Sequence, residues 1–215
     1  MPLGYPLGVV DVVYAPMPVE ERARRAQADG YAHIDVVLDP ARDLEREGAL
    51  ALPVGCPTAF PKPQPRWCAT PAPQAGEGAW ERALRWWRAA PGALLEPWAG
   101  SCVNSLDAVM AFRDAVPGVR VLVDTGHVAD WGGDPCALLE FADHVQLRQG
   151  KRGCTQVHVD DPTGEVDFDA VLARLDALGY RGKLSIEYFD LPEHGWPLAD
   201  PVAWARALQR KLLGR

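Results

Sequence analysis

The chain has 215 residues, 48% of them hydrophobic, and a formal net charge of −7. This length can bury a sizeable core, and we predict that residues 1–215 form a single domain. The acidic balance and the scattered Lys and Arg side chains argue against a nucleic-acid partner. Since no apolar stretch approaches the roughly 20 residues of a membrane helix, we expect no membrane partner either.

The cysteine pattern and the amino-terminal segment bear on location. The five cysteines are odd in number and none forms a C-x-x-C pair, which disfavours a zinc knuckle or a thioredoxin-type motif. The start of the chain lacks the charged region and long apolar core of a secretory signal. We therefore expect reduced thiols and a cytoplasmic location.

Short apolar, β-branched stretches alternate with amphipathic ones along the chain. Strands are predicted at 8–15, 32–38, 49–56, 66–70, 92–97, 119–125, 143–149 and 183–189. The helices between and after them are predicted at 18–30, weakly at 40–48, and at 78–90, 105–116, 134–142, 167–179 and 200–214. Alternating strands and helices are typical of βαβ units around a parallel sheet.

Eight predicted strands favour a closed (β/α)8 TIM barrel of the α/β class over a doubly wound sheet. No G-x-G-x-x-G or Walker A motif is present, so a nucleotide-binding fold has no support. The chain is short for a barrel, whose usual size is roughly 250 residues. Residues 57–65 are too proline-rich for a helix. We therefore predict a shortened barrel without the helix after strand 3, and another subunit of a homo-oligomer could cover that side.

Three acidic residues stand where later strands end: Glu96, Asp124 and Glu187. The carboxyl ends of barrel strands lie on one face, where active sites are built. Buried carboxylates that repel one another are most simply compensated by a divalent cation, and oxygen ligands suit Mn²⁺ or Mg²⁺, with Co²⁺ or Zn²⁺ as alternatives. Gln146 could add a neutral oxygen ligand. Singly, each acid could equally be a helix N-cap or a salt-bridge partner.

The strand 143–149 is unusually polar on one face, which carries His144, Gln146 and Arg148. His144 lies one step deeper than Gln146, so a core position and a functional one are both open. Arg148 is expected either at the pocket mouth or in a salt bridge with a strand-end acid. Among the tryptophans, Trp98 follows Glu96 closely and is our candidate for a wall of the substrate pocket.

The segments "LLEP", "VDTGH", "HVQLRQGKR" and "GYRGKLSIEY" resemble the xylose isomerase-like TIM barrels, a superfamily of sugar isomerases and epimerases. The Gln form of the third segment is most similar to the hydroxypyruvate isomerase branch. The resemblance implies a metal held by four strand-end residues, with two of the acids catalytic and two further side chains on the substrate. The implied ligands are Glu96, Asp124, Gln146 and Glu187; the catalytic acids are Glu96 and Glu187; the substrate contacts are His127 and Arg152.

We therefore predict a metal-dependent isomerase or epimerase of a small sugar or keto acid, working through an enediolate. One carboxylate would remove a proton from carbon and the other would return one. A dehydratase of a keto-polyol would use the same base. A barrel that has lost its chemistry and serves as a binding subunit is the non-enzyme alternative. The DNA-repair endonuclease branch of the fold is disfavoured, because it needs many histidine ligands and a basic groove, whereas the chain has five histidines and a net charge of −7.

Overall fold

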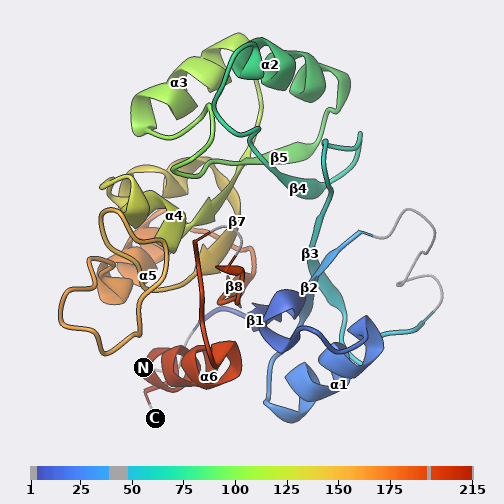
Figure 1. The fold of residues 1–215 in the computed structure, drawn as a ribbon, viewed down its shortest axis with the longest axis vertical. Helices are drawn as coiled ribbons and strands as arrows, with labels where there is room; N and C mark the ends of the chain where they lie inside the picture. The colour runs from blue at the N-terminus through green and yellow to red at the C-terminus, as the bar shows by residue number, and fades with distance from the viewer. Residues whose placement is uncertain (1–3, 39–47, 193–194, 215) are drawn as a thin grey trace.

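The computed structural model describes residues 4–38, 48–192 and 195–214. Eight strands follow one another around a closed barrel in sequence order, and β8 pairs in parallel with β1 to complete it. The predicted (β/α)8 TIM barrel is confirmed. Figure 1 shows the strands in the centre and the helices around them.

The elements are short. The strands are β1 (Leu7–Val10), β2 (Ile34–Val37), β3 (Val54–Thr58), β4 (Cys68–Pro71), β5 (Ala93–Glu96), β6 (Val121–Asp124), β7 (Ala142–Leu147) and β8 (Leu184–Ile186). The α-helices are α1 (Val19–Ala28), α2 (Ala79–Ala89), α3 (Leu106–Ala115), α4 (Thr125–Asp130), α5 (Phe168–Ala177) and α6 (Pro201–Leu212). Within the described residues, no helix is long and apolar enough to cross a membrane.

The structure differs from the sequence predictions at several places, among them the strand predicted at 49–56, which begins only at Val54. The strand predicted at 8–15 stops early, because the chain turns into the 3-10 helix η1 (Asp11–Tyr14). The helix predicted at 134–142 is two 3-10 turns, η2 (Pro135–Ala137) and η3 (Leu139–Phe141). The short helix α4 was not predicted. Residues 59–67, all described, form no helix, as the prolines indicated, whereas most of the weak helix at 40–48 lies outside the described residues.

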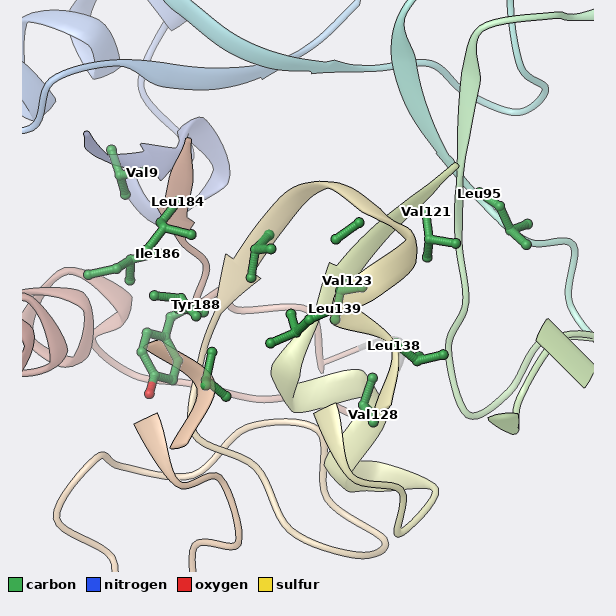
Figure 2. Packing of buried hydrophobic residues seen from close by; sticks show 14 of the residues in the cluster. Val9, Leu95, Val121, Val123, Val128, Leu138, Leu139, Leu184, Ile186 and Tyr188 are labelled. Atoms are coloured by element: carbon green, nitrogen blue, oxygen red, sulfur yellow. The ribbon is translucent and has the colours of Figure 1, made fainter. Parts of the chain in front are cut away.

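The apolar core lies between the barrel and its helices. Alternate side chains of each strand point outward, and those of β1, β6 and β8 pack under the helices, as Val9, Val121, Val123, Leu184 and Ile186 show (Figure 2). Side-chain caps fix the residues at which helices begin. The predicted N-cap Ser105 accepts a hydrogen bond from the Ala108 N–H of α3 at 3.1 Å.

Side chains inside the barrel form two layers, an upper one at the carboxyl ends of the strands and a lower one beneath it. The lower layer is apolar on one side, where Cys56, Ala69, Leu94 and Leu122 form a separate cluster. Because strand side chains repeat every second residue, Leu94 and Leu122 lie directly below the strand-end acids of β5 and β6. This layer therefore closes the floor of any site at the carboxyl ends.

The other side of the lower layer is polar and buried. His144 Nε2 lies 2.7 Å from Asp35 Oδ2, and His33 Nε2 lies 2.9 Å from Ser185 Oγ. All four side chains are buried. A Cβ at Gly8 would come within 2.2 Å of the His33 ring, so glycine there makes room for the imidazole. The network explains His33 and His144 as structural.

The pH dependence of stability should report on this layer. Burial lowers the pKa of His33 to about 4, against the raising effect of Asp35. A histidine with a lowered folded-state pKa contributes its stability above its ordinary pKa and loses it as the pH falls through 4. We expect His33→Gln to reduce the loss in unfolding free energy between pH 7 and pH 4 by about 3 kcal/mol.

Urea unfolding at a series of pH values measures this, with His158→Gln as the matched control, because the side chain of His158 is 37% exposed. Parallel pH profiles for the wild type and His33→Gln would contradict the assignment.

Candidate functional site

A pocket opens at the carboxyl ends of the barrel strands. Its volume is about 280 Å³, near the lower end of the roughly 300–1,000 Å³ typical of small-ligand sites. The polar residues in its wall are Thr58, Glu96, His127, Gln146 and Glu187. The apolar residues are Val10, Val12, Val37, Phe60, Pro71, Trp98, Phe189, Leu191 and Trp196. Five of the seven predicted site residues thus face one cavity, and Asp124 and Arg152 are outside its wall.

Glu96 is the last residue of β5, and only 7% of it is exposed. Burial raises the pKa of Glu96 to about 8, and the negative charge of Asp124 adds to the rise. Its Oε1 lies 3.8 Å from His127 Nε2. A carboxyl group with this pKa carries a proton at neutral pH and can release it near pH 8, which is the property of a general acid and base.

Glu187 follows β8 and faces the same pocket. Burial raises the pKa of Glu187 well above its ordinary value; Arg148 opposes the rise and Asp124 strengthens it. The carboxyl groups of Glu187 and Asp124 are within hydrogen-bond reach, with Glu187 as the donor. Two carboxyl groups with raised pKa values, one from β5 and one from β8, therefore line the pocket.

Asp124 ends β6 but is turned away from the cavity. Its Oδ1 accepts the backbone N–H groups of Gly126 at 2.8 Å and His127 at 3.1 Å, and so caps α4. Arg148 donates to both its oxygens, from Nε at 3.1 Å and from Nη2 at 2.5 Å. Burial alone would raise the pKa of Asp124, but the charge of Arg148 lowers it below the ordinary value. The acid is both an N-cap and a salt-bridge partner.

His127 lies on α4, beside Glu96. Its Nδ1 is 2.8 Å from Thr155 Oγ1, and its ring packs against Trp98 and Trp196, with centroids 6.4 and 5.8 Å away. Burial and the nearby charge of Arg148 lower the pKa of His127 to about 3. The imidazole is therefore neutral at physiological pH, and it lines the pocket with its Nε2 beside Glu96.

Gln146 has an unsatisfied oxygen. Its side chain is buried and lines the pocket, and its Oε1 has no hydrogen-bond partner among the described residues. Such an acceptor is costly when buried unless a ligand pairs with it. The oxygen is therefore available to accept a hydrogen bond from whatever enters the pocket.

The same residues can be tested as a cation site. Glu96, Asp124 and His127 each offer one ligand atom within 4.8 Å of the others, which makes them a possible site. An ion bound to Asp124 Oδ2 at about 2.1 Å would lie within about 4.6 Å of Arg148 Nη2, since Nη2 is 2.5 Å from that oxygen. The donor types suit a hard divalent cation, but their arrangement does not fit one while Arg148 holds Asp124.

Of the two remaining predicted site residues, one lies in the pocket wall and the other does not. Trp98 lies in the pocket wall, and its Nε1 donates to the Ala72 carbonyl at 2.7 Å. Arg152 lies on an exposed loop, where its Nη2 donates to the Gly132 carbonyl at 3.3 Å. The structure therefore does not bring Arg152 to the pocket. His158 makes an edge-to-face contact with Trp204, with ring centroids 5.4 Å apart, and His194 is outside the described residues.

Sequence reasoning missed most of the apolar wall. Phe189 could have been found, because it lies two residues after Glu187 and alternation places it on the same face. Trp196 and Phe60 come from loops, for which no periodic pattern exists. Arg148 was expected either at the pocket mouth or in a salt bridge with a strand-end acid, and the salt bridge is confirmed.

The family follows from a comparison with known sequences. The family model described as "Xylose isomerase-like TIM barrel" matches residues 24–212. Because this match spans most of the barrel, the chain belongs to the xylose isomerase-like TIM barrel family. A search of curated proteins returned no match.

Solved structures share the fold at low identity. An L-ribulose 3-epimerase is 17% identical, with a TM-score of 0.69 over 96% of this chain and 92% of that one. A 3-keto-D-glucoside 4-epimerase from E. coli is 14% identical, with a TM-score of 0.67 over 94% and 99%. A probable 3-DHS dehydratase from Bacillus anthracis is 13% identical, with a TM-score of 0.62 over 94% and 97%. Identities this low show the shared barrel alone.

The packing of Arg148 against α4 can be tested directly. A Cβ at Gly126 would lie 2.2 Å from the Thr155 carbonyl oxygen and 2.4 Å from Arg148 Cγ. We expect Gly126→Ala to lower the free energy of unfolding by about 1–3 kcal/mol through overpacking.

Gly4→Ala is the control, because a Cβ there meets nothing within 4 Å. Chemical denaturation compares the two variants. A Gly126→Ala protein as stable as the wild type would mean that Arg148 is not packed as described.

Proposed function

We propose that this protein is an isomerase or epimerase that moves a proton at a carbon beside the carbonyl of a small sugar or keto acid. The observation that carries the proposal is the pair of buried carboxyl groups, Glu96 and Glu187, that face one pocket with raised pKa values. Enzymes that exchange carbon-bound protons need such groups poised near working pH.

In the proposed reaction, one of the two carboxylates removes the proton and the other carboxyl group returns one. Return to the neighbouring carbon gives an isomer, and return to the opposite face of the same carbon gives an epimer. His127, neutral at physiological pH, contacts a substrate oxygen beside Glu96. The free Oε1 of Gln146 accepts a substrate hydroxyl. Each role uses a side chain that lines the pocket.

The pocket wall supports a compact substrate with one polar end. The polar residues come mainly from the ends of β5, β7 and β8, whereas Val10, Val37 and Phe60 form an apolar wall on the side of β1, β2 and β3. The hydroxy-carbonyl end would lie against the carboxyl groups. The C–H groups of the remainder would lie against the apolar side chains, where burial is favourable.

Hydrogen-bond donors or a positive charge must stabilise the enediolate oxygens as they form. The sequence-based prediction is a divalent cation, Mn²⁺ or Mg²⁺ first and Co²⁺ or Zn²⁺ second, and it stays a prediction. Since the ligand arrangement does not accommodate an ion beside Arg148, no step of the proposed reaction passes through one.

The five unpaired cysteines support the expected cytoplasmic location.

The proposal predicts that Glu187→Gln and Glu96→Gln each slow proton exchange by about 10²–10⁴-fold, because each removes an acid–base group without changing side-chain shape. Deuterium incorporation from D₂O at the substrate carbon, followed by NMR over a panel of ketoses and hydroxypyruvate, measures the rate.

Glu140→Gln serves as the control, because Glu140 is exposed on η3 and outside the pocket wall. Product analysis on the same panel separates isomerisation from loss of water. If a substrate is turned over and both pocket variants keep the wild-type rate, the proposal is wrong. Binding without any exchange across the panel would favour the non-enzyme alternative.

A further inference from the structure

Arg148 is the largest fully buried side chain of the chain's described part. Its guanidinium lies between two of the strand-end acids, with Nη2 2.5 Å from Asp124 Oδ2 and 3.1 Å from Glu187 Oε2. A charge removed this completely from water is stable only when it is paired. Asp124 and Glu187 are thus held together by a cation that belongs to the protein.

The surroundings of Arg148 are shaped for it. The Phe189 ring covers the guanidinium, with Cζ 4.4 Å from the ring centroid. On the other side, the absence of a Cβ at Gly126 lets the side-chain stem pass α4. The Arg148 backbone N–H also donates to Thr125 Oγ1 at 2.9 Å, and that hydroxyl donates to the Arg148 carbonyl at 2.8 Å. Backbone and side chain are both fixed.

The same contacts engage both oxygens of Asp124. Its Oδ1 accepts three N–H groups, from Gly126, His127 and Arg148, which exceeds the two lone pairs of one oxygen. Its Oδ2 accepts Nη2, and the same Nη2 lies 3.1 Å from Glu187 Oε2. A divalent ion on Asp124 would have to share Oδ2 with the guanidinium against its positive charge, or displace Arg148.

We propose that Arg148 is the resident counter-cation of the site, that it takes the place of a divalent metal ion at Asp124 and Glu187, and that the site works without bound metal. Arg148 is a positioning residue, because it lies behind the two acids and outside the pocket wall. It holds both oxygens of Asp124 and lies 3.1 Å from Glu187 Oε2. Only the statement about catalysis rests on the proposed isomerase or epimerase function.

The test is Mn²⁺ binding by the full-length protein after chelation and dialysis, followed by the electron paramagnetic resonance signal of free Mn²⁺. We expect weak binding by the wild type. Arg148→Met leaves the acids without their cation, and we expect it to bind one Mn²⁺ per chain at least about tenfold more tightly. Adding Glu96→Gln to Arg148→Met should weaken this binding again if the ion lies in the strand-end site.

Arg120→Met is the matched control, because it removes an arginine that pairs with Asp143 at 2.7 Å on a surface-exposed part of β7. It should bind Mn²⁺ as weakly as the wild type. Thermal unfolding with and without Mn²⁺ adds a readout that needs no substrate: the ion should stabilise Arg148→Met and leave the wild-type midpoint unchanged.

Stoichiometric Mn²⁺ binding by the wild type, with no gain in Arg148→Met, would overturn the proposal. So would an Arg148→Met protein that binds no Mn²⁺, or that stays unfolded in its presence, because the ion should replace the guanidinium. If the metal results are as expected but no substrate is exchanged, the proposed function fails while the role of Arg148 stands. If a substrate is exchanged, a chelator should leave its rate unchanged; loss of the rate would refute metal-free catalysis.

Discussion

The pairing of one guanidinium with two carboxyl groups constrains the whole upper face of the barrel. Arg148 is buried between Asp124, the last residue of β6, and Glu187, which follows β8. Once it is there, Asp124 is turned into the cap of α4, which in turn places His127 beside Glu96. The positions of the groups in the pocket therefore follow from how the strand-end charge is neutralised.

In the polar layer beneath this face a buried acid is also paired with a side chain of the protein, but here the partner is a histidine. Asp35 is fully buried and pairs with His144, two residues below Gln146 on β7. Asp35 and Asp124 are thus paired by two different side chains, a histidine in the lower layer and an arginine in the upper one. The Oε1 of Gln146 has no such partner among the described residues and faces the pocket.

Much of the fold could be predicted from the sequence, since alternation and helical periodicity are local properties. All eight strands and the helix-free segment after β3 follow from them. The strand-end acids were found for the same reason, because a parallel barrel brings its carboxyl ends together. What periodicity cannot give is which way a terminal side chain turns: Asp124 faces α4, and Arg152 lies on an outer loop. Those orientations depend on contacts between distant residues, such as that between Gly126 and Arg148.

A crystal structure soaked in Mn²⁺, with anomalous diffraction collected at the manganese edge, tests the central claim most directly. The account predicts no anomalous peak among Glu96, Asp124 and Glu187, with the guanidinium of Arg148 still bonded to both oxygens of Asp124. A peak within bonding distance of these acids, with Arg148 turned away from Asp124, would contradict it.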